Sequence, residues 1–165
     1  MKFFKSILLA LAILFIPGLV IAAGTVYGSV NSYKGASGNM EVLRITYTVT
    51  FGADASSPAN VALYNITDSS GGNKLPSFAG WWLLRIDTYP GATAPTANTD
   101  LYLWSVEDKI DVLGGNGVDA IDGAATYNSI YPAITSQSLT GAEIFDIDNN
   151  AVVNAGCVII FTLYR

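Results

Sequence analysis

The chain has 165 residues with eight Lys or Arg, thirteen Asp or Glu and no His, giving a formal net charge of −5. This length predicts one domain with a core large enough to fold without disulfides. The acidic charge excludes nucleic acid and anionic membranes as expected partners, because both would repel the protein. Since His is the usual general base and the commonest zinc ligand, we expect no enzymatic activity.

Residues 1–23 have the pattern of a signal peptide. Lys2 and Lys5 precede an apolar run that is broken at Pro17 and ends in small residues at Ala22 and Ala23. We expect export and cleavage near Ala23, leaving a domain of residues 24–165 with no stable membrane span. The alternative is a retained transmembrane anchor, but a span needs about 20 unbroken apolar residues.

The rest of the chain reads as short strands separated by loops rich in Gly, Asn, Ser and Pro. In residues 41–51 apolar side chains alternate with Arg and Thr, which is typical of a half-buried antiparallel strand. Residues 156–164 are apolar on both faces for much of their length, so we expect this strand in the middle of a sheet. The expected strands are residues 25–31, 41–51, 60–67, 81–89, 101–106, 110–113, 143–147 and 156–164.

Strands at this spacing predict an all-β fold, a single antiparallel β-sandwich or jelly-roll-like domain of about eight strands. Residues 118–128 are compatible with a short helix or with a long loop. Cys157 is the only cysteine and lies in an apolar run, so we expect a buried and unreactive thiol.

Three tryptophans, Trp81, Trp82 and Trp104, lie on two neighbouring predicted strands. Alternation places Trp81 and Trp82 on opposite faces, so one belongs to the core and the other is free to face outward. An outward-facing Trp is a candidate stacking platform for a sugar ring or a contact for a protein partner. The alternative is that sheet packing and loops cover these side chains.

Residues 114–122 read GGNGVDAID and fit a calcium-binding nonapeptide pattern. That site needs stacked copies of the repeat, and the chain has one, so we do not expect a calcium β-roll. Two interpretations stay open. Asp111, Asp119 and Asp122 either ligate calcium from a loop or stabilise tight turns beside the glycines.

Residues 94–104 (APTANTDLYLW), 110–117 (IDVLGGNG) and the later Tyr131-Pro132 resemble a pattern found in small tailed-phage virion and prophage proteins. There a Pro-rich loop leads to a Thr-Asp-x-Tyr-Asp strand, an acidic turn and Asp-hydrophobic-Leu-Gly-Gly. The similarity covers about forty residues, with Leu103 in place of the second Asp and Lys109 in place of a turn Gly. The resemblance implies a β-rich structural component without known activity, in which the glycine pair marks the exit from a strand.

Together these features predict a non-catalytic structural or binding protein, exported or virion-associated, that acts by assembly or by surface contact with protein partners. The alternative function is a secreted carbohydrate-binding module that uses Trp81, Trp82 or Trp104. No cofactor is expected beyond the calcium alternative.

Overall fold

A computed structural model describes residues 24–34, 40–58, 60–68, 74–121, 123, 127–133 and 138–165 of the chain. The predicted signal peptide, residues 1–23, lies outside the described residues, and so does Asp122. The described residues form two antiparallel sheets, and the all-β prediction is confirmed.

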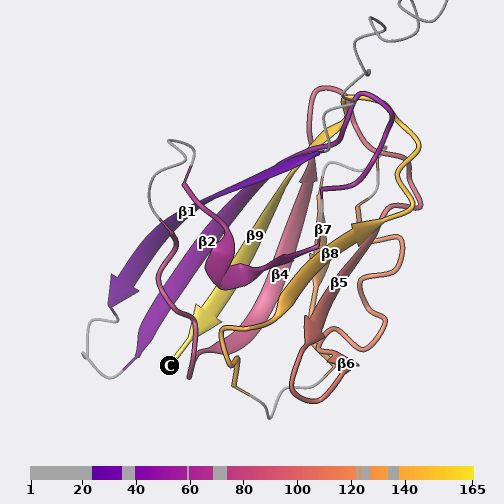
Figure 1. The fold of residues 1–165 in the computed structure, drawn as a ribbon. Helices are drawn as coiled ribbons and strands as arrows, with labels where there is room; N and C mark the ends of the chain where they lie inside the picture. Colours follow the sequence, from indigo (N-terminus) through magenta and orange to yellow (C-terminus); the bar gives the residue numbers. More distant parts are fainter. Residues whose placement is uncertain are drawn as a thin grey trace, which may run out of the picture.

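The larger sheet has five strands in the order β1-β2-β9-β4-β7 (Figure 1). Its strands are β1 (Thr25–Lys34), β2 (Glu41–Thr50), β4 (Trp82–Pro90), β7 (Asn128–Ile130) and β9 (Gly156–Tyr164). The C-terminal strand β9 pairs with β2 on one side and β4 on the other. Its central position confirms the expectation drawn from its apolar residues on both faces.

The smaller sheet has four strands in the order β3-β8-β5-β6. Its strands are β3 (Val61–Ala62), β5 (Asp100–Ser105), β6 (Ile110–Asp111) and β8 (Ile144–Asp148). In Figure 1 β5 and β8 lie side by side, next to the larger sheet. Only β5 and β8 pair over five residues, so these two strands carry most of the smaller sheet.

Alternation along β2 explains how the larger sheet acquires one buried face. Leu43, Ile45, Tyr47 and Val49 are buried, while the intervening Arg and Thr side chains lie on the other face. The ring of Tyr47 lies 5.4 Å from that of Phe145 in the smaller sheet, between ring centroids. The buried faces of the two sheets therefore meet in one core.

Three elements differ from the prediction in extent. The strand expected over residues 60–67 is only β3, because a 3₁₀ turn, η1 (Leu63–Asn65), follows it and buries Leu63 in the core. The strand expected over residues 110–113 ends at Asp111, where a series of turns begins. The short strand β7 was not expected, since its three residues carry too little pattern to be recognised.

Residues 118–128 contain no helix in the part that the structure describes. Val118 and Asp119 lie in a turn, and Ile121 bridges back to Thr99 next to β5. A loop therefore accounts for the described residues of this segment up to Tyr127, and Asn128 begins β7.

Candidate functional site

The outer face of the smaller sheet carries aromatic rings and carboxylates on adjacent strands. Because β5 turns Leu101 and Leu103 into the core, it turns the side chains of alternate residues outward. The neighbouring β8 does the same on either side of Phe145 and Ile147. We call the resulting surface the acidic–aromatic face, and its residues are Asp100, Tyr102, Trp104, Asp146 and Asp148.

Two rings of this face form a nearly parallel stack. The ring centroids of Tyr102 and Trp104 are 5.6 Å apart, and the planes are inclined by 22°. The Trp104 side chain is exposed at 36% of its surface, and Tyr102 is half-buried beside it. Two residues that are two positions apart on one strand thus build a single exposed aromatic surface.

The polar ends of both rings are bonded to carboxylates of the same face. The indole Nε1–H of Trp104 donates to Asp146 Oδ2 at 3.1 Å. The Tyr102 hydroxyl donates to Asp100 Oδ2 at 3.3 Å. These bonds hold the stacked rings in position while part of Trp104 stays exposed, which is the arrangement expected of a preformed binding surface.

Asp100 also ties this face to the loop that follows β6. Its Oδ1 accepts the backbone N–H of Asp119 at 2.8 Å, and its Oδ2 accepts a hydrogen bond from the Asn149 amide. The carboxylate is buried and satisfied by these donors. The role of Asp100 in this face is therefore to hold neighbouring groups in place.

Asp148 is the carboxylate of the face with no ion pair or hydrogen bond among the described residues. It stands directly opposite Asp100 in the β5–β8 register, two residues from Asp146. Partial burial raises the pKa of Asp148 above its ordinary value, and the negative charges of Asp146 and Asp100 raise it further. The face therefore carries negative charge that its own neighbours do not neutralise.

The three predicted tryptophans do not come together. Trp81 is 7% exposed, and the Arg165 guanidinium lies over its ring at 4.5 Å from the centroid. Trp82 is half-buried at the start of β4, opposite Tyr164 of β9. Trp104 lies in the other sheet, so of the three only this side chain belongs to the exposed aromatic stack.

The glycines of residues 114–117 form a tight turn after β6. Gly114 and Gly115 have φ angles of +61° and +84°, a region that disfavours side chains. A Cβ on Gly117 would lie 1.8 Å from the carbonyl oxygen of Leu101, which leaves room for glycine alone. Backbone geometry thus accounts for all three glycines that GGNG shares with the calcium pattern.

Asp111 supports this turn with both of its carboxylate oxygens. Oδ1 accepts the backbone N–H groups of Leu103 and Leu113 at 3.1 and 3.0 Å, and Oδ2 accepts that of Gly115 at 2.9 Å. Asp119 is exposed and has a φ of +52°, as Asp tolerates in turns. Among the described residues, no three His, Cys, Asp or Glu side chains form a group able to hold a metal ion.

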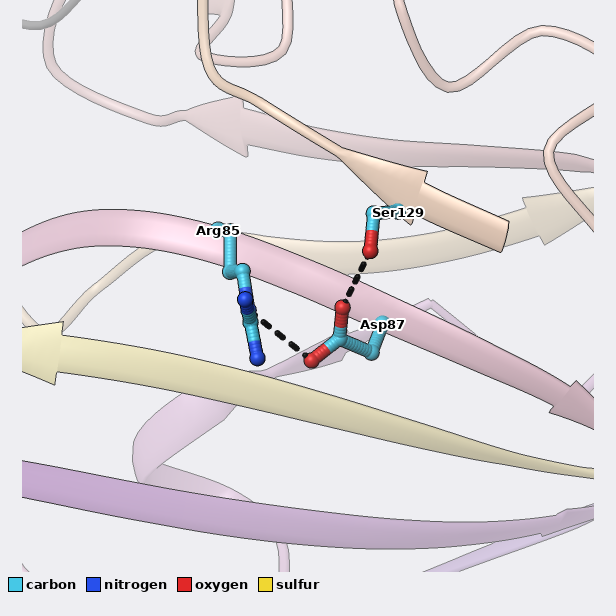
Figure 2. Close-up of polar contacts among 3 residues, drawn as sticks. All are labelled: Arg85, Asp87 and Ser129. Atoms are coloured by element: carbon cyan, nitrogen blue, oxygen red, sulfur yellow. Dashed lines mark hydrogen bonds and ion pairs between the residues drawn. The ribbon is translucent and has the colours of Figure 1, made fainter. Parts of the chain in front are cut away.

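A second polar cluster lies on the outer face of the larger sheet (Figure 2). The Asp87 side chain lies between Arg85 of its own strand and Ser129 of β7. The Ser129 hydroxyl donates to Asp87 Oδ1 at 2.5 Å, and Arg85 Nε donates to Oδ2 at 3.1 Å. Asp87 is only 1% exposed, and Arg85 of the same strand balances its charge. The bond from Ser129 adds a side-chain link to the backbone pairing of the short strand β7 with β4.

An open hollow lies over β1 and β2 on the same outer face, lined by Tyr27, Gly28, Ser29, Thr46 and Thr48. Its lining contributes hydroxyl groups and one aromatic ring, with no carboxylate, amine or thiol. The buried thiol of Cys157 lies on the core side of β9, where burial raises its pKa to about 12. The prediction of a buried cysteine is thus confirmed.

Sequence reasoning missed Asp100 and Asp146 as hydrogen-bond partners of the aromatic residues, and Asp148 as a member of the same face. The available signal was the spacing of two residues between Asp146 and Asp148, at the end of the strand expected over residues 143–147, which places them on one face. What the sequence does not show is that this strand pairs with β5, in a register that sets Asp146 opposite Tyr102. The association of rings with carboxylates is therefore a product of the tertiary fold.

No helix among the described residues is long and apolar enough to cross a membrane. Comparison of the chain with models of protein families, with curated proteins and with solved structures finds no match.

Proposed function

We propose that this protein is a non-catalytic β-sandwich of the jelly-roll type, exported or virion-associated, which acts by assembly or by surface contact with a protein partner. The observation that carries the proposal is the exposed stack of Tyr102 and Trp104 on the acidic–aromatic face. Aromatic side chains dominate the binding energy of protein interfaces, where Trp and Tyr are enriched at the centre of the contact.

The chemistry of the surface supports a binding role over a catalytic one. The chain has no His, and the carboxylates nearest the aromatic stack hold the indole and phenol groups in place. The signal-peptide pattern of residues 1–23 supports export, while the resemblance to tailed-phage virion proteins supports a place in a virion. Genes for capsid or tail proteins beside the gene for this chain would favour the virion.

Substitution of the exposed ring tests the proposed function. Trp104→Ala should weaken self-association or partner binding at least tenfold, because it removes the largest exposed aromatic surface of the stack. Sedimentation velocity over a range of concentrations measures the association. Val153→Ala is the control, since it removes exposed apolar surface from a turn far from the stack in sequence. Equal association of both variants and the parent protein would contradict a role for this face.

Carbohydrate binding is the second candidate, and the same stack favours it. The exposed ring of Trp104, held in a nearly parallel stack with Tyr102, offers an apolar surface for a sugar ring, and the exposed Asp148 supplies an acceptor for sugar hydroxyl groups on the same face. Binding should change the intrinsic tryptophan fluorescence when a soluble polysaccharide is added. The change should disappear in Trp104→Phe, because Trp81 and Trp82 lie outside the stack; a change that persists would contradict this candidate.

A further inference from the structure

The acidic–aromatic face carries negative charge that needs a positive partner. Asp148 lies opposite Asp100 and two residues from Asp146, and no Lys or Arg of the described residues pairs with any of them. Like charges directly opposite each other on adjacent strands destabilise a sheet. A cation that docks against the face would relieve this repulsion and could also contact the exposed ring of Trp104.

The outer face of the larger sheet carries positive charge in a single cross-strand row. Arg44 of β2 and Arg85 of β4 both stand opposite Thr162 of the central strand β9. The two arginines are therefore two strands apart, about 10 Å between Cα atoms. We call Arg44, Thr162 and Arg85 the arginine row.

Arg44 is the free cation of the arginine row. Its side chain is exposed and forms no hydrogen bond or ion pair among the described residues. Arg85 is 44% exposed, but its Nε is bound to Asp87. The neighbouring outward side chains of β2, at Thr46 and Thr48, are uncharged. No outward-facing carboxylate of β2 therefore lies beside Arg44 to neutralise its charge.

These two surfaces point away from each other. The acidic–aromatic face and the arginine row lie on the outer sides of two sheets whose inner sides share one core. One molecule cannot bring them together, but two molecules can. A contact between two different patches of identical chains is heterologous, and when the rotation does not close into a ring it produces an open filament.

We propose that the acidic–aromatic face of one molecule docks on the arginine row of another, so that copies of this chain assemble head to tail. The inference rests on the proposed function and names its partner as a second copy. Arg44 of one molecule pairs with Asp148 of the next, and the stacked rings of Tyr102 and Trp104 lie in the same contact, farther along β5. The chain already makes a contact of this type, since the Arg165 guanidinium covers the Trp81 ring at 4.5 Å while its Nη2 pairs with Glu41.

Charge complementarity favours a second copy over the other candidate occupants. A neutral sugar can donate hydrogen bonds to Asp148 but cannot neutralise its charge, and nucleic acid or an anionic membrane would be repelled by that charge. The arginine row supplies both the sign of charge and an exposed guanidinium, which pairs with carboxylates and stacks on aromatic rings.

Charge reversal on each side of the contact tests the inference. Arg44→Glu and Asp148→Lys should each weaken self-association at least tenfold in sedimentation velocity at low salt. An equimolar mixture of the two variants should recover association, because the carboxylate introduced in one variant then meets the amine introduced in the other, with the charges exchanged. Association of the parent protein should also weaken in high salt.

Lys74→Glu is the matched control, since it makes the same change of net charge on an exposed residue outside both faces. It should associate like the parent protein, and circular dichroism should show all variants folded. Association of Arg44→Glu at the parental level, or a mixture that fails to recover, would overturn the inference. If Trp104→Ala still abolishes association in that case, the proposed function stands and the second surface lies elsewhere. A parent protein that stays monomeric at low salt would overturn head-to-tail assembly, and binding of a basic peptide or a polysaccharide would then decide the proposed function.

Discussion

Two groups of aromatic side chains in this protein have opposite relations to their polar atoms. In the core, Tyr47 packs against Phe145 and Phe161, with ring centroids 5.4 and 5.1 Å away, and its buried hydroxyl has no hydrogen-bond partner among the residues that the structure describes. On the acidic–aromatic face, the polar atoms of Tyr102 and Trp104 are both bonded to carboxylates, while the rings are partly exposed.

This difference in hydrogen bonding indicates that the core rings serve packing, whereas the outer rings are arranged for binding. The core tolerates an unpaired phenol because the ring of Tyr47 fills the space between the sheets, and burial raises its pKa so that it stays uncharged. On the outer face the carboxylates fix two rings that contribute little to the core. Substitutions in the first group should therefore change stability, and substitutions in the second should change association.

The largest expected effect is on the core group. Phe161→Ala should lower the free energy of unfolding by about 3–5 kcal/mol, because it opens a cavity between the sheets. Trp104→Ala should cost about 1 kcal/mol, since it removes one hydrogen bond and a partly exposed ring. Urea unfolding measures both values, and similar losses for the two variants would remove the distinction between the groups.

The next effect concerns the turn that supports the outer face. Asp111→Ala should lower the free energy of unfolding by about 2 kcal/mol, because three backbone N–H groups lose their acceptor. Asp111→Asn, which keeps one carbonyl oxygen, should lose less. If support of the turn is the whole role of Asp111, millimolar calcium should leave the thermal midpoint unchanged; a clear rise would establish the calcium alternative.

Removing the unpaired hydroxyl of Tyr47 tests the same difference between the two groups of aromatic residues. Tyr47→Phe should raise the free energy of unfolding by about 1 kcal/mol, since it removes a buried polar group without a partner and keeps the ring. The matched control is Tyr102→Phe, which removes a bonded hydroxyl and should lower stability slightly. Urea unfolding of the two variants should therefore give changes of opposite sign.

The smallest effect depends on pH. The raised pKa of Asp148 means that the folded state favours its protonated form, so the stability it contributes is present at low pH and is lost as the pH rises through the raised pKa. Asp148→Asn should therefore be more stable than the parent by less than about 1 kcal/mol near pH 7. The difference should vanish near pH 3, below the ordinary Asp pKa of about 4.

Asp54→Asn is the control of opposite sign. A hydrogen bond from Ser56 lowers the pKa of Asp54, so its contribution is present above the ordinary Asp range and is lost as the pH falls. This substitution should reduce stability at neutral pH and have less effect in acid. An Asp148 variant that followed the same direction would contradict the like-charge repulsion on the outer face.

Much of the strand content could be predicted from local pattern, and the strands that escaped prediction were those with little pattern. The alternation of Leu43, Ile45 and Tyr47 with polar residues marks β2, and the apolar run of β9 marks a central strand. The three residues of β7 carry no such signal, since what makes them a strand is their backbone pairing with β4, supported by the bond from Ser129 to Asp87 across 42 residues of sequence. The early end of β6 follows from the bonds that Asp111 makes to the turn.

The site could be predicted only as a set of candidates. Alternation predicts that Trp81 and Trp82 point to opposite sides, but it does not say which of them is covered. The tertiary structure covers Trp81, because the C-terminal residue Arg165 returns beside Glu41 and lies over its ring. It leaves Trp104 exposed on a sheet whose edge strand β6 is only two residues long.

The sequence by itself determined the longer strands and the direction of their side chains, because a period of two is a local property of the extended backbone. Only the tertiary structure decided that β8 lies beside β5, which sets Asp148 opposite Asp100 and Asp146 opposite Tyr102. Strand partners and register depend on contacts between residues that are far apart in the chain. The acidic–aromatic face exists for that reason, since neither its rings nor its carboxylates form it alone.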